Sequence, residues 1–456
     1  MSGVSLKRGG QVRVELKKSG ELPRWRISMT KKVGVAILGL GVVGGGTYET
    51  LVSHHDFYLA TQQVDITVEA VLDKNLERLR SLKVADEIIA NSIEEVIANP
   101  NVDIVIETIG GIGVAKDFVT KALREGKTVV TSNKELICKY SHELEKIARH
   151  NHCGLYYEAS CVGGVPIIRT LLDGVQANHI QRMMGIVNGT TNYILTKMAN
   201  EGADYQEVLK EAQKLGYAEA DPTADVDGFD STYKLSILSS MAFHTKIPYT
   251  KIFREGISKI DTCDIAYGKE IGYTLKLLAI GKRNENAVEV RVHPTFIPSS
   301  HPLASVNDSF NAVYMTGDAV DDVMLYGRGA GALPTASAVV SDVIYAATHS
   351  EIRYSTFKNN ATAETNVKFI SDFTSAYYMR LSVEDKAGVL AKITGIFAKN
   401  NVSIVEITQR MDKVEEGRLP LIIITHQTKE NSVKSAVAKI NASGIATVES
   451  LIRVEA

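Results

Sequence analysis

Short apolar runs alternate with stretches of helical spacing in the first third of the chain. The apolar runs lie at 33–38, 65–72, 102–108 and 127–131, and a helical stretch follows each of them. Strands that are separated by helices in this way are typical of a parallel α/β sheet. The pattern therefore predicts a parallel α/β domain over residues 29–155.

The spacing of apolar positions changes after about residue 150. Longer helices are predicted at 190–201, 204–215 and 230–243, and strands of antiparallel type near 180–188, 289–297 and 310–326. These elements predict an α+β domain at 156–346. The polar range 347–375 has little periodicity and is predicted to be a linker.

The last eighty residues show a third pattern. It reads strand, helix, strand, strand, helix, strand, with bounds at 377–383, 388–400, 402–410, 419–426, 431–441 and 445–453. This order predicts a ferredoxin-like βαββαβ module at 376–456.

Residues 1–28 differ in composition from the rest of the chain. They carry seven basic and two acidic residues and contain no hydrophobic core of a secretory signal. Met29 then opens the first apolar run. We expect 1–28 to be a disordered leader outside the fold, with a functional arm as the alternative.

Charge and composition exclude several classes of function. Lys and Arg total 51 against 53 for Asp and Glu, a formal charge of −2, which supplies no basic field for nucleic acid or an anionic membrane. No apolar run approaches the roughly 18 residues that cross a bilayer. The four cysteines form no CxxC pair, which favours a reducing compartment. We therefore expect a cytoplasmic protein that acts on a small molecule.

A glycine-rich loop follows the first predicted strand. Gly39, Gly41 and Gly44 form a GxGxxG pattern that opens a helix. Gly39 permits a tight turn, Gly41 lets backbone N–H groups approach a pyrophosphate, and Gly44 allows the helix to pack closely on the strand. Val42 and Val43 occupy the first turn of this helix, whose N-terminus would face the phosphates. The arrangement predicts a dinucleotide-binding site of Rossmann type.

Asp73 ends the second predicted strand, where a carboxylate would bind a ribose 2′-hydroxyl and favour NAD. Lys74 follows it and would suit the 2′-phosphate of NADP. The choice between NAD and NADP stays open at this point.

Five further segments identify a family by their order and spacing. They are VVTSNKEL (129–136), YYEASCVGGVPII (156–168), GIVNGTTNYIL (185–195), LGYAEADPTADVDGFDSTYKL (215–235) and GRGAGALPTASAV (327–339). The chain resembles homoserine dehydrogenase over 29–346, and its C-terminal module is similar to an ACT regulatory domain. The resemblance implies reversible reduction of L-aspartate 4-semialdehyde to L-homoserine with NAD(P)H, in the biosynthesis of threonine, methionine and isoleucine.

The resemblance also implies roles for the charged residues of these segments. Lys234 matches the general acid that protonates the aldehyde oxygen, and Glu219, Asp225 and Asp230 match substrate-binding carboxylates. Lys134 matches a lysine near the nicotinamide and the substrate. Asp230 and Lys234 are four residues apart and so share a helix face, where Asp230 could hold Lys234 or compete for its proton. A second cation such as Lys134 would lower the pKa of Lys234.

Other members of the motif set imply backbone contacts. Gly189 and Thr190 are expected to be donors for the substrate or the nicotinamide amide, and Thr190 or Thr191 is expected to cap the helix that begins there. Thr108, at the end of the third strand, is expected to lie at the cofactor. Gly331 is also expected to lie at the cofactor. It belongs to the range 327–346, which would complete the dinucleotide-binding domain.

The segment 156–168 resembles the monovalent-cation loop of the family. Glu158 would offer its carboxylate and Cys161, Gly163 and Val165 their backbone carbonyls, a set of hard oxygen ligands that suits Na⁺. A nucleophilic Cys161, as in semialdehyde dehydrogenases that form thioesters, is the less favoured interpretation, because no histidine lies in a recognisable pairing motif with it.

The ACT-like module predicts regulation and assembly. Its first turn contains Asp385, Ala387, Gly388 and Val389, and such modules typically pair side by side and bind amino acids near this loop. Threonine is the first candidate effector, and a homodimer or homotetramer is expected. A dimerisation tail without a ligand is the alternative.

Two other functions compete with this interpretation. One is another NAD(P)-dependent semialdehyde or hydroxy-acid dehydrogenase, and the other is a non-catalytic amino-acid sensor. A sensor would have no reason to keep both Lys234 and Glu219 in this spacing.

Overall fold

The computed structural model describes residues 30–349, 351–352, 367–409 and 417–455. The predicted leader, 1–28, lies outside these residues, and so does most of the predicted linker. Within the described residues, no helix combines the length and the apolar character that crossing a bilayer requires.

The first sheet is entirely parallel, in the order β2-β1-β3-β4-β5. Its strands are β1 (Lys31–Leu38), β2 (Val64–Leu72), β3 (Ile104–Glu107), β4 (Thr128–Thr131) and β5 (Leu155–Tyr156). The helices between them are α1 (Val42–Ser53), α2 (His55–Gln62), α3 (Leu76–Ser81), α4 (Ile93–Ala98), α5 (Gly113–Arg124) and α6 (Lys134–His150). The predicted α/β fold is confirmed. Because β1 lies between β2 and β3, the strand order reverses there, which is where such sheets bind ligands.

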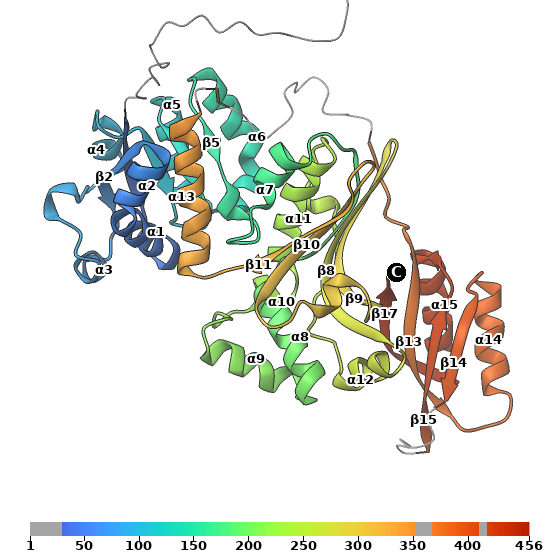
Figure 1. Ribbon diagram of the computed structural model, residues 1–456. Helices are drawn as coiled ribbons and strands as arrows, with labels where there is room; N and C mark the ends of the chain where they lie inside the picture. Colours follow the sequence, from blue (N-terminus) through green and yellow to red (C-terminus); the bar gives the residue numbers. More distant parts are fainter. Residues whose placement is uncertain (1–29, 350, 353–366, 410–416, 456) are drawn as a thin grey trace, which may run out of the picture.

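Helix α13 (Ala332–Thr348) returns from the second half of the chain to this sheet. Figure 1 shows it beside the N-terminal helices, and its Val339 and Val343 share a buried cluster with Ile37 of β1. A Cβ at Gly46 of α1 would lie 2.8 Å from the carbonyl oxygen of Ala332. The two helices therefore pack too closely for any residue but glycine at position 46.

The second sheet begins with antiparallel strands in the order β11-β10-β6-β8-β9. The strands are β6 (Ile180–Ile186), β8 (Tyr273–Asn284), β9 (Ala287–Pro298), β10 (Phe310–Gly317) and β11 (Asp321–Arg328). The accompanying helices are α7 (Ile167–Arg169), α8 (Gly189–Glu201), α9 (Tyr205–Lys214), α10 (Thr223–Val226), α11 (Phe229–Ala242) and α12 (Thr262–Glu270). The three long predicted helices agree with α8, α9 and α11 to within a residue.

The strands predicted in this part need one correction and one addition. The range predicted near 310–326 is a hairpin of two strands, β10 and β11. Strand β8 was not predicted, because seven consecutive residues, 275–281, are buried and the run lacks the alternation of a half-exposed strand.

The C-terminal module has the predicted βαββαβ order. Its elements are β13 (Thr374–Glu384), α14 (Val389–Lys399), β14 (Ile404–Gln409), β15 (Arg418–Thr425), α15 (Glu430–Ser443) and β17 (Ala446–Val454), with strands in the order β17-β13-β15-β14. The range predicted as linker, 347–375, is too wide at both ends. Helix α13 reaches Thr348, β12 (Lys368–Phe369) pairs with β9, and β13 begins at Thr374.

The C-terminal module is hydrogen-bonded to the second sheet. Strand β17 runs parallel to β9, with Arg453 opposite Thr295 and Val454 opposite Phe296. One continuous sheet therefore runs from β11 at one edge to β14 at the other, in the order β11-β10-β6-β8-β9-β17-β13-β15-β14. Figure 1 shows this sheet extending from the catalytic part of the chain into the C-terminal module. The sequence predicted the module but not this junction.

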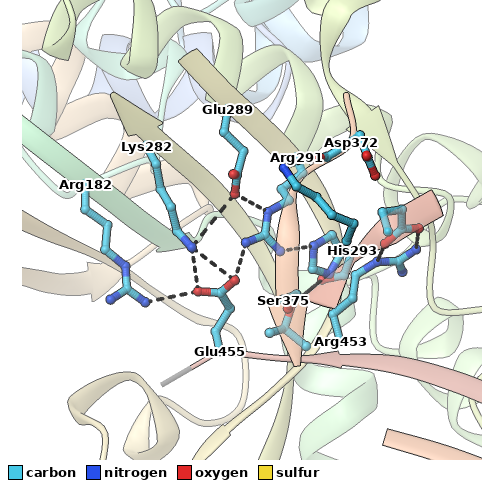
Figure 2. Close-up of polar contacts among 12 residues, drawn as sticks. Arg182, Lys282, Glu289, Arg291, His293, Asp372, Ser375, Arg453 and Glu455 are labelled. Atoms are coloured by element: carbon cyan, nitrogen blue, oxygen red, sulfur yellow. Dashed lines mark hydrogen bonds and ion pairs between the residues drawn. The ribbon is translucent and has the colours of Figure 1, made fainter. Parts of the chain in front are cut away.

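A buried ionic network lies across the junction (Figure 2). The Glu455 carboxylate follows β17 and pairs with Arg291 of β9, which is fully buried, and with Lys282 Nζ of β8 at 2.9 Å. Arg182 Nη2 of β6 lies 3.4 Å from the same carboxylate. Burial opposes ionisation, but Arg291 and Lys282 outweigh it and lower the pKa of Glu455.

His293 is fully buried next to Arg291 in this network. Arg291 Nη1 lies 2.9 Å from His293 Nε2, so Nε2 must accept and the ring proton belongs on Nδ1, 3.0 Å from the carbonyl oxygen of Pro294. Burial, followed by the charges of Arg453 and Arg291, lowers the pKa of His293 well below its usual value. The imidazole is therefore neutral in the folded protein.

The neutral His293 predicts a specific loss of stability in acid. A histidine with a lowered folded pKa takes up its proton only in the unfolded chain, so its stabilisation is complete above about pH 6.5 and is lost as the pH falls below that value. We expect the wild-type unfolding free energy, measured in urea, to fall between pH 8 and pH 5 by about 2 kcal/mol more than that of His293→Gln. Parallel pH profiles of the two proteins would contradict the assignment.

Candidate active site

The glycine loop after β1 has the geometry of a phosphate cradle. Gly39 has φ +87°, and a Cβ at Gly44 would overlap the carbonyl oxygen of Gly39. A Cβ at Gly41, by contrast, would have no heavy atom within 4 Å. Val42 is exposed and Val43 half-buried in the first turn of α1. The loop thus combines a forced turn with open space at the helix N-terminus, which suits a pyrophosphate.

Thr108 lies beside this loop, at the end of β3. Its hydroxyl donates to the carbonyl oxygens of Gly39, at 2.7 Å, and Leu38, at 3.1 Å. Gly110 and Gly111 follow with φ of +80° and +66° and open space above them. This second glycine turn was missed in the sequence, where GGIG at 110–113 was its signal.

Buried Glu107 holds the second glycine turn in place. Its carboxylate accepts hydrogen bonds from the backbone N–H groups of Ile109, at 2.8 Å, and Gly110, at 3.1 Å, and from the Thr131 hydroxyl at 2.5 Å. Burial is the main reason that its pKa is raised. Glu107 therefore connects the ends of β3 and β4, where a cofactor would lie.

Asp73 contacts the glycine loop from the end of β2. One carboxylate oxygen accepts the N–H of Leu40, and the other accepts the N–H of Asn75 at 2.7 Å. Arg78 of α3 donates from Nε to the carbonyl oxygen of Leu40 at 3.0 Å, while Lys74 is exposed. Arg78 was not predicted from the sequence, and it places a guanidinium group against the loop.

A buried carboxylate bridges the two predicted lysines. Asp230 of α11 lies 2.6 Å from Lys134 Nζ through one oxygen and 2.8 Å from Lys234 Nζ through the other. Lys234 Nζ also donates to the carbonyl oxygen of Val187, just after β6, at 2.7 Å. Side chains from α6 and α11 thus meet at the carboxyl end of the parallel sheet, and we call these three residues the Asp230 cluster.

The charges of the Asp230 cluster are strongly coupled. Burial alone would raise the pKa of Asp230, but the ammonium groups of Lys134 and Lys234 lower it well below its usual range. Asp230 in turn raises the pKa of Lys134. The carboxylate therefore stays ionised and holds Lys234 in place, one of the two roles left open by the sequence. The carboxylate also lies between the two ammonium groups, so the charge of Asp230 opposes the effect of the Lys134 charge on Lys234.

Asn188 connects Asp225 to this cluster. Its Nδ2 donates to Asp225 at 2.7 Å and to Asp230 at 2.9 Å, and its Oδ1 accepts the N–H of Thr191 at 2.8 Å. Asn188 is therefore the N-cap of α8, and the prediction that Thr190 or Thr191 caps this helix is wrong. Burial, with a contribution from Asp230, raises the pKa of Asp225.

The remaining predicted substrate contacts surround α8. A Cβ at Gly189 would lie 2.8 Å from the carbonyl oxygen of Ser309, and the Thr190 hydroxyl donates to the carbonyl oxygen of Tyr217 at 2.6 Å. Thr190 thereby holds the segment that leads to Glu219, whose side chain is exposed. Within the described part of the chain, Glu219 makes no hydrogen bond or ion pair with the Asp230 cluster.

The predicted cation loop is tightly folded. The two oxygens of Glu158 accept the N–H groups of Ile168, at 2.8 Å, and Arg169, at 2.7 Å, and the Val165 carbonyl accepts the N–H of Ile167 at 2.8 Å. Burial, with a contribution from Asp342, raises the pKa of Glu158 to about 7. Among the residues that the structure describes, no three His, Cys, Asp or Glu side chains are grouped for a metal ion, so a site here depends on backbone carbonyls.

Cys161 and Gly163 lie in the same loop. Cys161 is fully buried, and burial raises the pKa of its thiol to about 12, which argues against the nucleophilic alternative. Gly163 has φ +56° and packs on the backbone of Gly329. Gly331, with φ +117°, caps α13 where that helix meets α1, and so lies near the glycine loop.

The predicted effector loop lies at the surface of the C-terminal module. Asp385, Ala387 and Gly388 are exposed and Val389 is half-buried at the start of α14. Gly388 has φ +89°, which explains the glycine at the helix N-cap.

Three family models match the chain. "Homoserine dehydrogenase, NAD binding domain" matches residues 39–158, "Homoserine dehydrogenase" matches 166–344, and "ACT domain" matches 377–444. These ranges contain the glycine loop, the Asp230 cluster and most of the C-terminal module.

Individual relatives give the same result. The chain is 41% identical over 429 residues to the homoserine dehydrogenase of Bacillus subtilis, covering 93% of this chain and 99% of that one. It is 39% identical over 418 residues to that of Neisseria gonorrhoeae, covering 90% and 96%.

Solved structures show the same likeness. The homoserine dehydrogenase from Thiobacillus denitrificans matches with a TM-score of 0.87 and 38% identity, covering 93% of this chain and 98% of that one. A hyperthermophilic archaeal homoserine dehydrogenase in complex with NADPH matches with a TM-score of 0.60 and 28% identity, covering 71% and 100%.

Proposed function

The chain belongs to the homoserine dehydrogenase family, and from this premise we propose how its residues perform the reaction. The reaction is the reversible NAD(P)H-dependent reduction of L-aspartate 4-semialdehyde to L-homoserine. The observation that carries the proposal is the Asp230 cluster, which holds a buried lysine ammonium at the carboxyl end of the parallel sheet. A bound nicotinamide cofactor supplies the hydride.

Lys234 is the proton donor in this proposal. Negative charge develops on the aldehyde oxygen as the carbonyl carbon is reduced, and an ammonium group can stabilise and then protonate that oxygen. Lys234 uses two of its three N–H groups on Asp230 and on the carbonyl oxygen of Val187. The third is left for the substrate, and in the reverse direction the neutral amine takes the proton of the alcohol.

The surrounding residues orient the substrate and Lys234. Both oxygens of Asp230 already bind ammonium groups, so we assign it as a positioning residue. Asp225 and Glu219 are then the carboxylates that bind the substrate ammonium, and Lys134, Gly189 and the N–H of Thr190 are donors for its carboxylate or for the nicotinamide amide.

Removing the Lys234 ammonium should slow the chemistry and leave cofactor binding intact. We expect Lys234→Ala to lower kcat for homoserine oxidation by at least about a hundredfold, with the Kd for NADPH within twofold of wild type by fluorescence titration. Lys139→Ala is the matched control, because Lys139 lies on the same helix as Lys134 but, among the described residues, its ammonium pairs with Glu135 and not with Asp230. A fall in kcat of less than about tenfold would place the proton donor elsewhere.

The cofactor site fits NADP(H) through Arg78. Asp73 is already engaged by the N–H groups of Leu40 and Asn75, and the Arg78 guanidinium lies against the glycine loop with exposed Lys74 nearby in the sequence. A planar guanidinium is well suited to a phosphate group. The NADPH complex of the archaeal relative supports the use of this cofactor.

The Arg78 assignment predicts a change in cofactor preference. We expect Arg78→Ala to raise the KM for NADPH at least about tenfold and that for NADH less than about threefold, since only NADPH carries the 2′-phosphate. Arg80→Ala, on the exposed face of the same helix, should change neither. Equal effects of Arg78→Ala on both cofactors would show that Arg78 supports the loop and does not read the phosphate.

A monovalent cation and an amino-acid effector complete the proposal. Na⁺ is assigned to the loop of Glu158, Cys161, Gly163 and Val165, supported by the resemblance of 156–168 to the cation loop of the family. Threonine is assigned as the effector of the ACT module, supported by the family match at 377–444. The homodimer or homotetramer stays a prediction.

A further inference from the structure

A polar cleft of about 490 Å³ lies between the catalytic part of the chain and the C-terminal module. One wall is the segment 254–260, which begins at the last residue of β7 (Phe253–Arg254) and leads to α12. The other wall is the middle of β17, Val448–Ile452, with Val437 of α15. The cleft thus opens where the C-terminal module faces the turn that precedes α11.

The lining of the cleft has charges of both signs. Arg254 and Lys259 supply cations, and Asp227, Glu255 and Glu449 supply carboxylates. Apolar contacts come from Ile260, Pro294, Val437 and Leu451. Cations and carboxylates that share one small cleft match a zwitterion, whose carboxylate and ammonium each need a partner of opposite charge. An α-amino acid with a small side chain is the simplest ligand of this kind.

The wall of the cleft formed by the segment 254–260 packs directly against the turn 226–228. Arg254 Nη1 donates to the carbonyl oxygen of Asp227 at 2.8 Å, and the N–H of Ile257 donates to that of Val226 at 2.8 Å. A Cβ at Gly256 would overlap the backbone of this turn. The Arg254 guanidinium also covers the ring of Phe229, the first residue of α11, at 3.2 Å from its centroid.

This turn lies between two members of the active site. Asp225 precedes it and Asp230 follows it, and Asn188 Nδ2 bridges their carboxylates. The segment 254–257 is hydrogen-bonded to the backbone between Asp225 and Asp230. A shift of that segment therefore displaces both carboxylates relative to Lys134.

The two walls of the cleft are joined by an ion pair. Arg453, the residue after Ile452, pairs with Glu255 through two contacts of 2.5 and 3.1 Å, and with Glu430 of α15 at 2.5 Å. Glu255 is adjacent to Arg254, so the C-terminal module holds the wall that contacts the turn. A charged ligand bound beside this pair changes the attraction between the walls.

We propose that this cleft binds a small α-amino acid, with its carboxylate toward Arg254 and Lys259 and its ammonium toward Asp227 and Glu449, and that binding shifts the turn 226–228. The inference rests on the regulation proposed above and gives it a second location, distinct from the loop 385–389. That loop lies near the start of β17, since Val383 pairs with Ala446, whereas the cleft follows β17 from Val448 to Ile452.

Calorimetric titration of the full chain with L-threonine, L-serine and L-alanine, which all have small side chains, separates the two locations. We expect one of the three to bind wild type, and Lys259→Glu and Glu449→Lys, both at exposed positions, each to weaken its Kd at least tenfold. Asp385→Lys, a charge reversal in the exposed loop, should leave Kd within twofold. No binding to wild type, or loss of binding in Asp385→Lys, would overturn the proposal.

Hydrogen exchange measures the connection to the active site. The same amino acid should change the exchange rates of amides in 225–231 at least threefold in wild type and much less in Lys259→Glu at the same ligand concentration. Binding without any change in these amides would overturn the proposed shift of the turn. Neither readout requires turnover, so a protein that binds the amino acid but does not oxidise homoserine would count against the proposed function alone.

Discussion

The proposed active site depends on one buried carboxylate that is shared by two lysines. Asp230 is 3% exposed, and its two oxygens bind ammonium groups that come from different parts of the fold, Lys134 from α6 and Lys234 from its own helix. A buried charge is tolerated only when it is paired, and removing one partner of such a pair typically costs about 3–5 kcal/mol. Asn188 adds a further donor and brings Asp225 to the same point. The charge balance of this cluster therefore fixes where the Lys234 ammonium lies.

The requirement that a buried charge be paired also acts at the junction of the catalytic part and the C-terminal module. Strand β17 pairs with β9 over two residue pairs of the described chain, and the buried Glu455 carboxylate reinforces this contact through Arg291 of β9. Glu430 and Arg453, both in the C-terminal module, form a second buried pair beside it. Such pairs are directional and tolerate little displacement. The C-terminal module is thus joined to the catalytic sheet by strand pairing, by an apolar cluster that Tyr378 and Ile452 share with Phe296, and by charged contacts. One of these charged contacts, between Arg453 and Glu255, holds the segment that packs on the turn before α11.

Local patterns in the sequence predicted what depends on local structure. The GxGxxG loop, the helices α8, α9 and α11 and the βαββαβ order all follow from periodicity and glycine placement. The pair Asp230 and Lys234 follows from their spacing of four on one helix. Strand β8 was not predicted because burial on both faces removes the alternation of apolar and polar residues. The role of Arg78 was not predicted because its contact with Leu40 joins residues 38 positions apart. The β9–β17 pairing and the cleft depend on how two domains meet, which no local pattern encodes.

Chemical rescue tests the assignment of Lys234 most directly. If a primary amine at this position carries the proton, methylamine added to Lys234→Ala should restore homoserine oxidation in proportion to its concentration, because the small amine occupies the space of the missing group. Asp230→Ala, which keeps the lysine but loses its positioning carboxylate, should show no such recovery. A folded, cofactor-binding Lys234→Ala protein that methylamine does not rescue, or equal rescue of both variants, would contradict the account.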